Sequence, residues 1–338
     1  MQSLVLGATG LVGRHIVNQL VAAGEHPFAL SRSPEVDTRS IRWFTGNIED
    51  TSTLVFPPFQ TLYCTVHCHL LAGALPSLAR SGLQRVIFFT STSILTKLSS
   101  GDAQEREQVQ MLANGEKEAI AVCEKHSIAW TVLRLTIIYD EGRDPSISRL
   151  ARLIERFGFF PLAGFGKGLR QPVHAEDLAL GALQAAASKA AINKTYNVPG
   201  AEVIAYREMI GRIFDGLDKP RRIIPLPPFL WRAAFHMAQR YFPSANAEMG
   251  ARMSKDLVFD ASAAVHDFGW KPRHSIHGSV KQRNAPYDED RDACMRRRNR
   301  WTKRGDARQR RCITHRRTVT LKGATISDAF ARRSSTNS

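Results

Sequence analysis

Three glycines in the first 13 residues constrain this chain more than any other feature of its sequence. Gly7, Gly10 and Gly13 follow the short apolar run of residues 3–6, and an amphipathic run begins directly after them. Because the apolar residues then recur at helical spacing, the sequence predicts a buried strand, a tight turn and a helix. Glycines let the backbone approach a pyrophosphate, and the N-terminus of a helix favours the anion. The stretch therefore predicts a nucleotide-binding turn, with a bare strand-to-helix turn as the alternative.

The spacing of these glycines carries a family resemblance. Gly-Ala-Thr-Gly-Leu-Val-Gly over residues 7–13 resembles the short-chain dehydrogenase/reductase superfamily, in its extended and atypical branches, where NAD-dependent epimerases and dehydratases of nucleotide sugars belong. The resemblance implies an α/β fold, a Rossmann-type doubly wound parallel sheet with a small C-terminal substrate lobe. It also implies a set of cofactor-binding residues at the turn and at the following strand ends: Gly7, Thr9, Gly10, Leu11, Val12, Gly13, Arg14, Arg32, Asn47, Ile48 and Thr65.

Two arginines bear on which nicotinamide cofactor is expected. In NAD-preferring folds an acidic residue after the second strand holds the ribose 2′-hydroxyl. Here that position carries Arg32, and Arg14 follows the last glycine of the turn. Because two guanidinium groups suit a 2′-phosphate, the sequence favours NADP over NAD. The alternative is that Arg32 is a solvated turn residue.

Later segments extend the resemblance over residues 1–275. Residues 133–144 look like the segment in which extended members leave the nucleotide domain. Residues 170–179 resemble their Arg-x-x-Val-His-Val-Asp-Asp-Leu-Ala signature, and residues 267–273 resemble their last motif. The predicted organisation is a nucleotide part over about residues 1–140, a substrate lobe mainly over 141–275, and a basic, disordered tail over 276–338.

The catalytic residues depart from the superfamily's pattern. Relatives carry Tyr-x-x-x-Lys on a helix, where the ammonium lowers the pKa of the phenol so that it can transfer a proton. Here Lys117 is the candidate lysine, but Ala113 stands four residues before it. The hydroxyl-rich strand end makes Thr92 the first choice for a substrate contact in catalysis, and Tyr139 is a possible replacement proton donor. The predicted substrate contacts are Ser91, Ser93 and Arg170.

The cysteines and histidines do not predict a metal site. Five cysteines are few and unevenly spread, which argues against a disulfide framework. Cys64, His67, Cys68 and His69 are close in sequence, but neighbouring residues at a strand end point in different directions and lack a second pair of ligands. Packing beside the cofactor is the expected role. His174 and Asp177 are expected to fix a strand-to-helix transition.

The charge and hydropathy of the sequence limit the cellular location and the partners that we expect. Residues 276–338 hold 17 lysines and arginines against 6 acidic residues, so much of the basic character lies beyond the family-like part. The tail is expected to be dispensable, with a nucleic-acid or anionic-membrane contact as the alternative. No apolar run suffices for a membrane span, although residues 229–242 suit a peripheral membrane contact. The expectation is a cytoplasmic protein, without a specific nucleic-acid partner, that forms a homodimer.

The predicted function follows from the glycine turn and the resemblance. It is NAD(P)-dependent hydride transfer on a nucleotide sugar or a similar anionic small molecule, by an epimerase or dehydratase. Two alternatives stay open. One is an NADPH-dependent reductase of a small carbonyl compound. The other, raised by the missing tyrosine, is a cofactor-binding regulatory or assembly protein that has lost catalysis.

Overall fold

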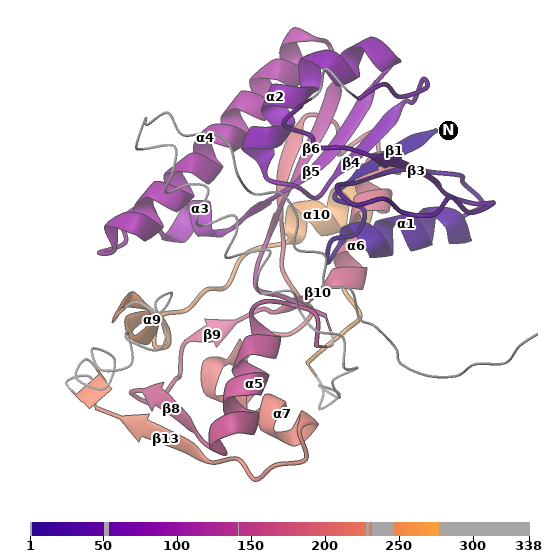
Figure 1. The fold of residues 1–338 in the computed structure, drawn as a ribbon. Helices are drawn as coiled ribbons and strands as arrows, with labels where there is room; N and C mark the ends of the chain where they lie inside the picture. Colours follow the sequence, from indigo (N-terminus) through magenta and orange to yellow (C-terminus); the bar gives the residue numbers. More distant parts are fainter. Residues whose placement is uncertain (1, 51–53, 141, 228–229, 232–246, 277–338) are drawn as a thin grey trace, which may run out of the picture. The chain divides into compact units, whose positions relative to one another are not determined.

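The computed structural model describes residues 2–50, 54–140, 142–227, 230–231 and 247–276, which belong to one compact unit, residues 1–286 (Figure 1). The predicted tail, apart from its first residue, lies outside these described residues, as does most of the segment 229–242. Within the described residues, no helix is both long enough and apolar enough to cross a membrane.

Seven parallel strands form the central sheet, in the order β11-β6-β5-β4-β1-β2-β3. This is the strand order of a doubly wound nucleotide-binding sheet, extended by one strand. The fold class predicted from the sequence is therefore confirmed. The strands are β1 (Ser3–Leu6), β2 (Phe28–Ser31), β3 (Arg42–Thr45), β4 (Thr61–Cys64), β5 (Arg85–Ser91), β6 (Ala129–Leu135) and β11 (Lys194–Val198).

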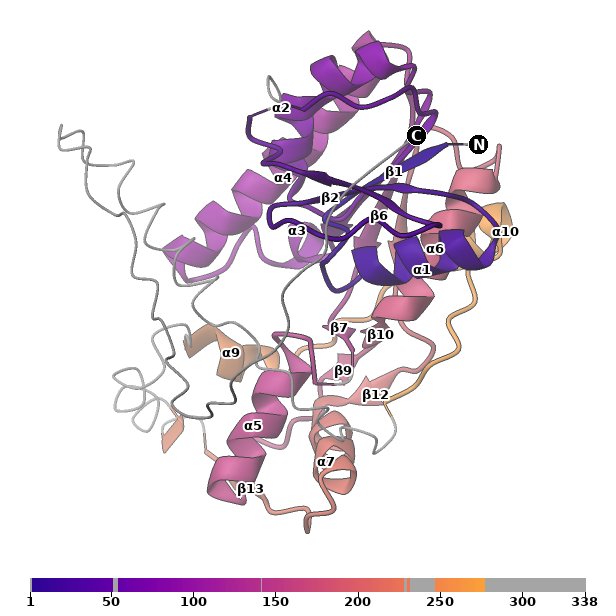
Figure 2. The same ribbon diagram turned by 45° about the vertical axis from the view of Figure 1, so that its right-hand side comes forward.

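Helices cover both faces of this sheet, because alternate side chains of each strand point to opposite faces (Figures 1 and 2). Leu4 and Leu6 of β1 belong to the core beneath α2 and α4, whereas Val5 belongs to the core beneath α1 and α6. The short helix α10 also packs on α6. The bounds are α1 (Gly13–Ala22), α2 (Cys68–Leu78), α4 (Ala103–Lys125), α6 (Ala175–Ala187) and α10 (Ser262–Phe268).

A third core lies outside the sheet and starts at Tyr139. Its large apolar side chains come mainly from α5 (Ile147–Phe157), α7 (Tyr206–Gly216) and the paired strands β8 (Phe160–Ala163) and β13 (Ile223–Leu226). The chain returns to the sheet for α6, β11 and α10, so the substrate lobe and its boundary near residue 140 stay predictions. The remaining elements are η2 (Ala79–Ser81), α3 (Ser93–Thr96), β7 (Ile138–Tyr139), β9 (Leu169–Arg170), β10 (Val173–His174), β12 (Ile204–Ala205) and α9 (Ala247–Arg252).

Two helical glycines test how tightly α6 packs. A Cβ at Gly181 would lie 2.4 Å from the ring of Trp270, whereas a Cβ at Gly73 of α2 meets nothing within 4 Å. We expect Gly181→Ala to lower the free energy of unfolding by about 1–3 kcal/mol, because the buried indole must shift. The matched change Gly73→Ala should raise it by about 0.5–1 kcal/mol, since alanine has the lower entropy cost in a helix. Urea unfolding followed by circular dichroism measures both; equal effects would contradict the packing argument.

Candidate functional site

The glycine turn joins β1 to α1 with almost no space between its backbone segments. Gly7 has φ +76°, a left-handed conformation that favours glycine, and its carbonyl accepts a 2.8 Å hydrogen bond from the Gly10 N–H. A Cβ at Gly13 would lie 2.1 Å from the Gly7 oxygen, and one at Gly10 would lie 2.9 Å from it. The turn is therefore closed to side chains and presents backbone to any group at the start of α1. This geometry fits a bound pyrophosphate.

Other predicted cofactor residues follow β4, which pairs with β1, and β3, which lies beyond β2. The Thr65 side chain, directly after β4, lies 3.0 and 3.1 Å from the carbonyl oxygens of Leu6 and Gly7, to which its hydroxyl can donate. Asn47 follows β3 and donates a 3.0 Å hydrogen bond to Glu49. Ile48 beside it is buried in the core. Because parallel strands end at one edge, these residues share the edge of the sheet with the turn.

The two arginines predicted at the ribose have different surroundings. Arg32 is exposed directly after β2, where its guanidinium is free to meet a ligand from solvent. Arg14, by contrast, forms an ion pair with the buried carboxylate of Asp140. The two residues are 126 positions apart, so no local sequence pattern predicts this pair. Of these two arginines, Arg32 is therefore the one whose guanidinium remains available for a ligand.

The Asp140 carboxylate also faces two histidines, which no local sequence pattern connects to it. His15 Nε2 lies 3.1 Å from one of its carboxylate oxygens, and His174 Nε2 lies 4.0 Å from the other. Burial lowers the pKa of His174 below its usual value, and the neighbouring His274 lowers it further. In the resembling segment Asp140 stands where relatives carry glycine, which was the one signal available. The cluster links α1 to the start of the lobe.

The hydroxyl groups at the end of β5 divide into two kinds. Thr92 is buried, and both its backbone N–H and its hydroxyl donate to the Leu135 carbonyl, at 3.0 and 3.1 Å. Ser91 and Ser93 are half-buried, and their hydroxyl oxygens lie 2.9 Å apart. The structure thus commits Thr92 to the end of β6, whereas the two serines contact each other.

Helix α4 does not place Lys117 against the sheet. Lys117 is exposed, whereas Ala113 and Glu116 are buried on the inner side of the helix. Glu116 forms an ion pair with Arg134 of β6 and accepts a 2.7 Å hydrogen bond from the Thr90 hydroxyl. The inner side of α4 therefore carries a structural ion pair near the end of the sheet.

Tyr139 and Arg170 have their own neighbours in the lobe. Tyr139 is buried, and its ring packs edge-on against His174 with 5.0 Å between centroids. Arg170 is also buried and donates to the carbonyls of Leu169 and Lys255, at 2.6 and 2.8 Å, and to that of Arg252. Burial lowers the pKa of Arg170. These contacts favour a structural role for Arg170, so its predicted substrate contact stays a prediction.

The cysteines that follow one another closely at the end of β4 have structural contacts in the fold. Cys64 and Cys68 are buried and direct their thiols to backbone carbonyls, at 3.8 and 3.3 Å. Burial raises the pKa of both thiols, to about 12 and about 11, so neither is a thiolate at neutral pH. A different group of close donor atoms occurs among the described residues, formed by His174, Glu176 and His274.

The fold and the turn define a class, a nucleotide-binding protein with a doubly wound sheet and an added lobe. Comparisons with known proteins indicate which members of this class the chain resembles. No family model matches the chain. A UDP-glucose 4-epimerase of Vibrio cholerae is 22% identical over 313 residues, which are 82% of this chain and 93% of the relative.

Solved structures show the same fold. A UDP-glucuronic acid 4-epimerase from Bacillus cereus, in complex with NAD, has a TM-score of 0.64 at 16% identity, over 87% of this chain and 99% of its own. A UDP-glucose 4-epimerase from Thermotoga maritima, with UDP-glucose, has a TM-score of 0.63 at 16% identity, over 83% and 96%. The resemblance to the epimerase/dehydratase branch of the short-chain dehydrogenase/reductase superfamily is confirmed.

The ion pair on the inner side of α4 gives a direct test of its structural weight. We expect Glu116→Gln to lower the free energy of unfolding by about 3 kcal/mol, because it leaves the Arg134 guanidinium without its buried partner. Glu118→Gln, two residues along on the exposed side of the same helix, should change it by less than about 0.5 kcal/mol. Guanidinium unfolding monitored by tryptophan fluorescence compares them, and a similar small effect for both would remove the structural role.

Proposed function

We propose that the chain binds NAD or NADP at the turn of residues 7–13 and acts on a nucleotide sugar as an NAD(P)-dependent epimerase or dehydratase. The closed backbone of the turn is the observation that carries the proposal, since three Cβ positions there are excluded or crowded by neighbouring atoms. Similarity to a UDP-glucose 4-epimerase over 93% of that protein's length supports the substrate class. A location in the cytoplasm and a homodimer stay predictions from the sequence.

The bound nicotinamide would supply the redox step, by accepting a hydride from a sugar carbon and returning it, so that no cofactor is consumed. The chain's contribution is to hold the pyrophosphate at the start of α1 and the sugar beside the ends of β5 and β6. Among the proposed substrate contacts, Ser91 and Ser93 suit this role best, because they are half-buried and their hydroxyls contact each other rather than a backbone carbonyl.

A proton must leave the sugar hydroxyl when the hydride leaves the carbon. Of the predicted participants, Lys117 is exposed on α4 and the Thr92 hydroxyl donates to the Leu135 carbonyl, so Tyr139 is the proposed proton donor. The inner side of α4 has Ala113 where relatives have their tyrosine, so the proton donor comes from a different element in this chain. Tyr139 is our choice because β7 follows directly after β6, beside whose end the sugar is proposed to lie.

The first test measures whether the chain converts UDP-glucose to UDP-galactose. The full chain is incubated with NAD and UDP-glucose, and UDP-galactose is followed by chromatography and by proton NMR. We expect interconversion without net formation of NADH, and Gly10→Val should reduce it at least about tenfold, equivalent to about 1.4 kcal/mol, because the new side chain occupies the exposed turn. Gly73→Ala is the matched control. Cofactor binding without turnover of any nucleotide sugar would favour a regulatory role, and net NADPH oxidation with a small carbonyl would favour the reductase.

The second test concerns the preference for NADP. We propose that it depends on Arg32, since Arg14 is paired with Asp140. Loss of one charge-assisted contact corresponds to about 1.5–3 kcal/mol, so Arg32→Ala should weaken NADPH binding by about tenfold to 100-fold and leave NADH binding unchanged. Nucleotide fluorescence during titration measures both cofactors. Equal weakening of the two, or tighter binding of NADH by the parent chain, would overturn the preference.

A further inference from the structure

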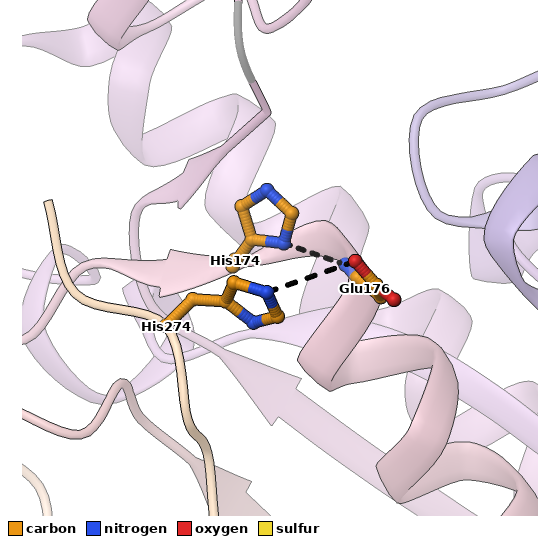
Figure 3. A group of neighbouring side chains, drawn as sticks. All are labelled: His174, Glu176 and His274. Atoms are coloured by element: carbon orange, nitrogen blue, oxygen red, sulfur yellow. Dashed lines mark hydrogen bonds and ion pairs between the residues drawn. The ribbon is translucent and has the colours of Figure 1, made fainter. Parts of the chain in front are cut away.

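We propose that His174, Glu176 and His274 form a binding site for a divalent transition-metal ion, for which Zn²⁺ is the probe. The three side chains come from β10, from the first turn of α6 and from the segment after α10 (Figure 3). Two imidazoles and one carboxylate are a donor set that such ions accept. The site is independent of the proposed reaction, because none of the three residues is assigned to cofactor or substrate.

The donor atoms are already close to the spacing that an ion needs. One donor atom from each residue lies within 4.8 Å of the others. In a tetrahedral zinc site with bonds of about 2.0–2.1 Å, two ligand atoms lie roughly 3.4 Å apart. The side chains of Glu176 and His274 are 50% and 42% exposed, so both can rotate to close this difference. His274 Nε2 is 3.7 Å from the Glu176 carboxylate before any such movement.

The hydrogen bonds of His274 leave the correct nitrogen free. Its Nδ1 lies 2.9 Å from the carboxylate of Asp177, which can only accept, so Nδ1 carries the proton. Nε2 then presents its lone pair toward Glu176. Asp177 is itself buried and held by the backbone N–H groups of Arg273 and His274, at 3.1 and 3.0 Å. A carboxylate on the far nitrogen of a metal-binding histidine is a common supporting arrangement, because it fixes the ring and its tautomer.

His174 also has one protonated nitrogen and one nitrogen with a lone pair, but in this ring Nδ1 has the lone pair. Its Nδ1 accepts a 3.2 Å hydrogen bond from the backbone N–H of Glu176, so Nδ1 has the lone pair and Nε2 carries the proton. Nε2 faces the carboxylate of Asp140 at 4.0 Å. Figure 3 shows that the lone-pair nitrogens of both rings face the start of α6. The rings stack with 4.3 Å between centroids, which places them on one side of Glu176.

Two local features oppose a cation, and the surrounding charges offset them. The ion would displace the hydrogen bond from the Glu176 N–H to His174, and it would lie near the positive end of the α6 dipole. Asp140, Glu176 and Asp177 bring three carboxylates to the two rings. Arg14 neutralises only Asp140, so the immediate surroundings stay favourable to a positive ion.

A bound ion would tie together segments that are far apart in the sequence. His274 follows α10 and Trp270, whereas His174 and Glu176 begin α6. These segments already meet through the hydrogen bonds of Asp177 to residues 273 and 274 and through the stacked rings of His174 and His274. An ion with three protein ligands and a water molecule would strengthen this link, so the folded chain should be more stable with metal than without it.

Zinc binding by the full chain tests the site. After treatment with a chelator, Zn²⁺ is titrated in competition with a chromogenic chelator, and the thermal midpoint is measured with and without the ion. Because loss of a supporting residue alone costs about 10–100-fold, His274→Ala and Glu176→Ala should each weaken this binding at least about 100-fold. Both should also abolish the rise in midpoint. His266→Ala, which removes an exposed histidine of α10, is the matched control and should bind like the parent.

The comparison between variants decides the outcome. The proposal is overturned if the parent, His274→Ala and Glu176→Ala bind Zn²⁺ with equal affinity, because the ion is then held by other residues of the chain. It is also overturned if the parent does not bind. Should His274→Ala not fold, Glu176→Ala still decides, since that side chain is half exposed and its removal opens no core. None of these results depends on epimerase turnover.

Discussion

The close approach of α1 to the carbonyl of Gly7 is the contact on which the rest of the structure depends. With only 2.1 Å between that oxygen and a Cβ at Gly13, the helix can begin there only if both positions are glycine. Thr65 closes the other side, because a Cβ at Gly7 would lie 2.5 Å from its hydroxyl oxygen. The turn is thus held between the ends of β1 and β4. The core beneath α1, with Val5 and Ile16, takes its position from this contact.

Local patterns predict the start of the sheet, and local hydrogen bonds decide where other helices begin. The apolar run of residues 3–6 predicted β1, and the amphipathic run after the glycines predicted α1. Helix α4 begins at Ala103 because Asp102 caps it by accepting a 3.0 Å hydrogen bond from the Glu105 N–H. Helix α6 begins at Ala175, since His174 caps its first turn by accepting a hydrogen bond from the Glu176 N–H. Capping is a property of the folded turn, which a count of apolar spacing does not include.

The site was less predictable because its contacts join distant parts of the chain. Spacing after the last glycine placed Arg14 near the ribose, but Asp140 takes its guanidinium from the other end of the nucleotide domain. The same is true of Arg170. Its guanidinium was expected to contact a substrate, but it donates hydrogen bonds to the carbonyls of residues 252 and 255. In both cases a charge that looks available in the sequence is neutralised or satisfied by a partner that is distant in the sequence. No periodic pattern encodes such partners.

The inner side of α4 decides whether the proposed cofactor binding and the proposed turnover depend on the same residues. A helix turns by about 100° per residue, so Glu116 and Lys117 cannot face the sheet together. Glu116 faces it, and its oxygens accept hydrogen bonds from Thr90 and Arg134. The helix that carries the proton donor in relatives therefore offers a neutral ion pair and Ala113 at this surface. Under the proposed function, the nucleotide would be held at the turn, whereas proton transfer would use groups on other elements, at the end of β5 or at Tyr139. The two properties can accordingly be lost or kept one without the other.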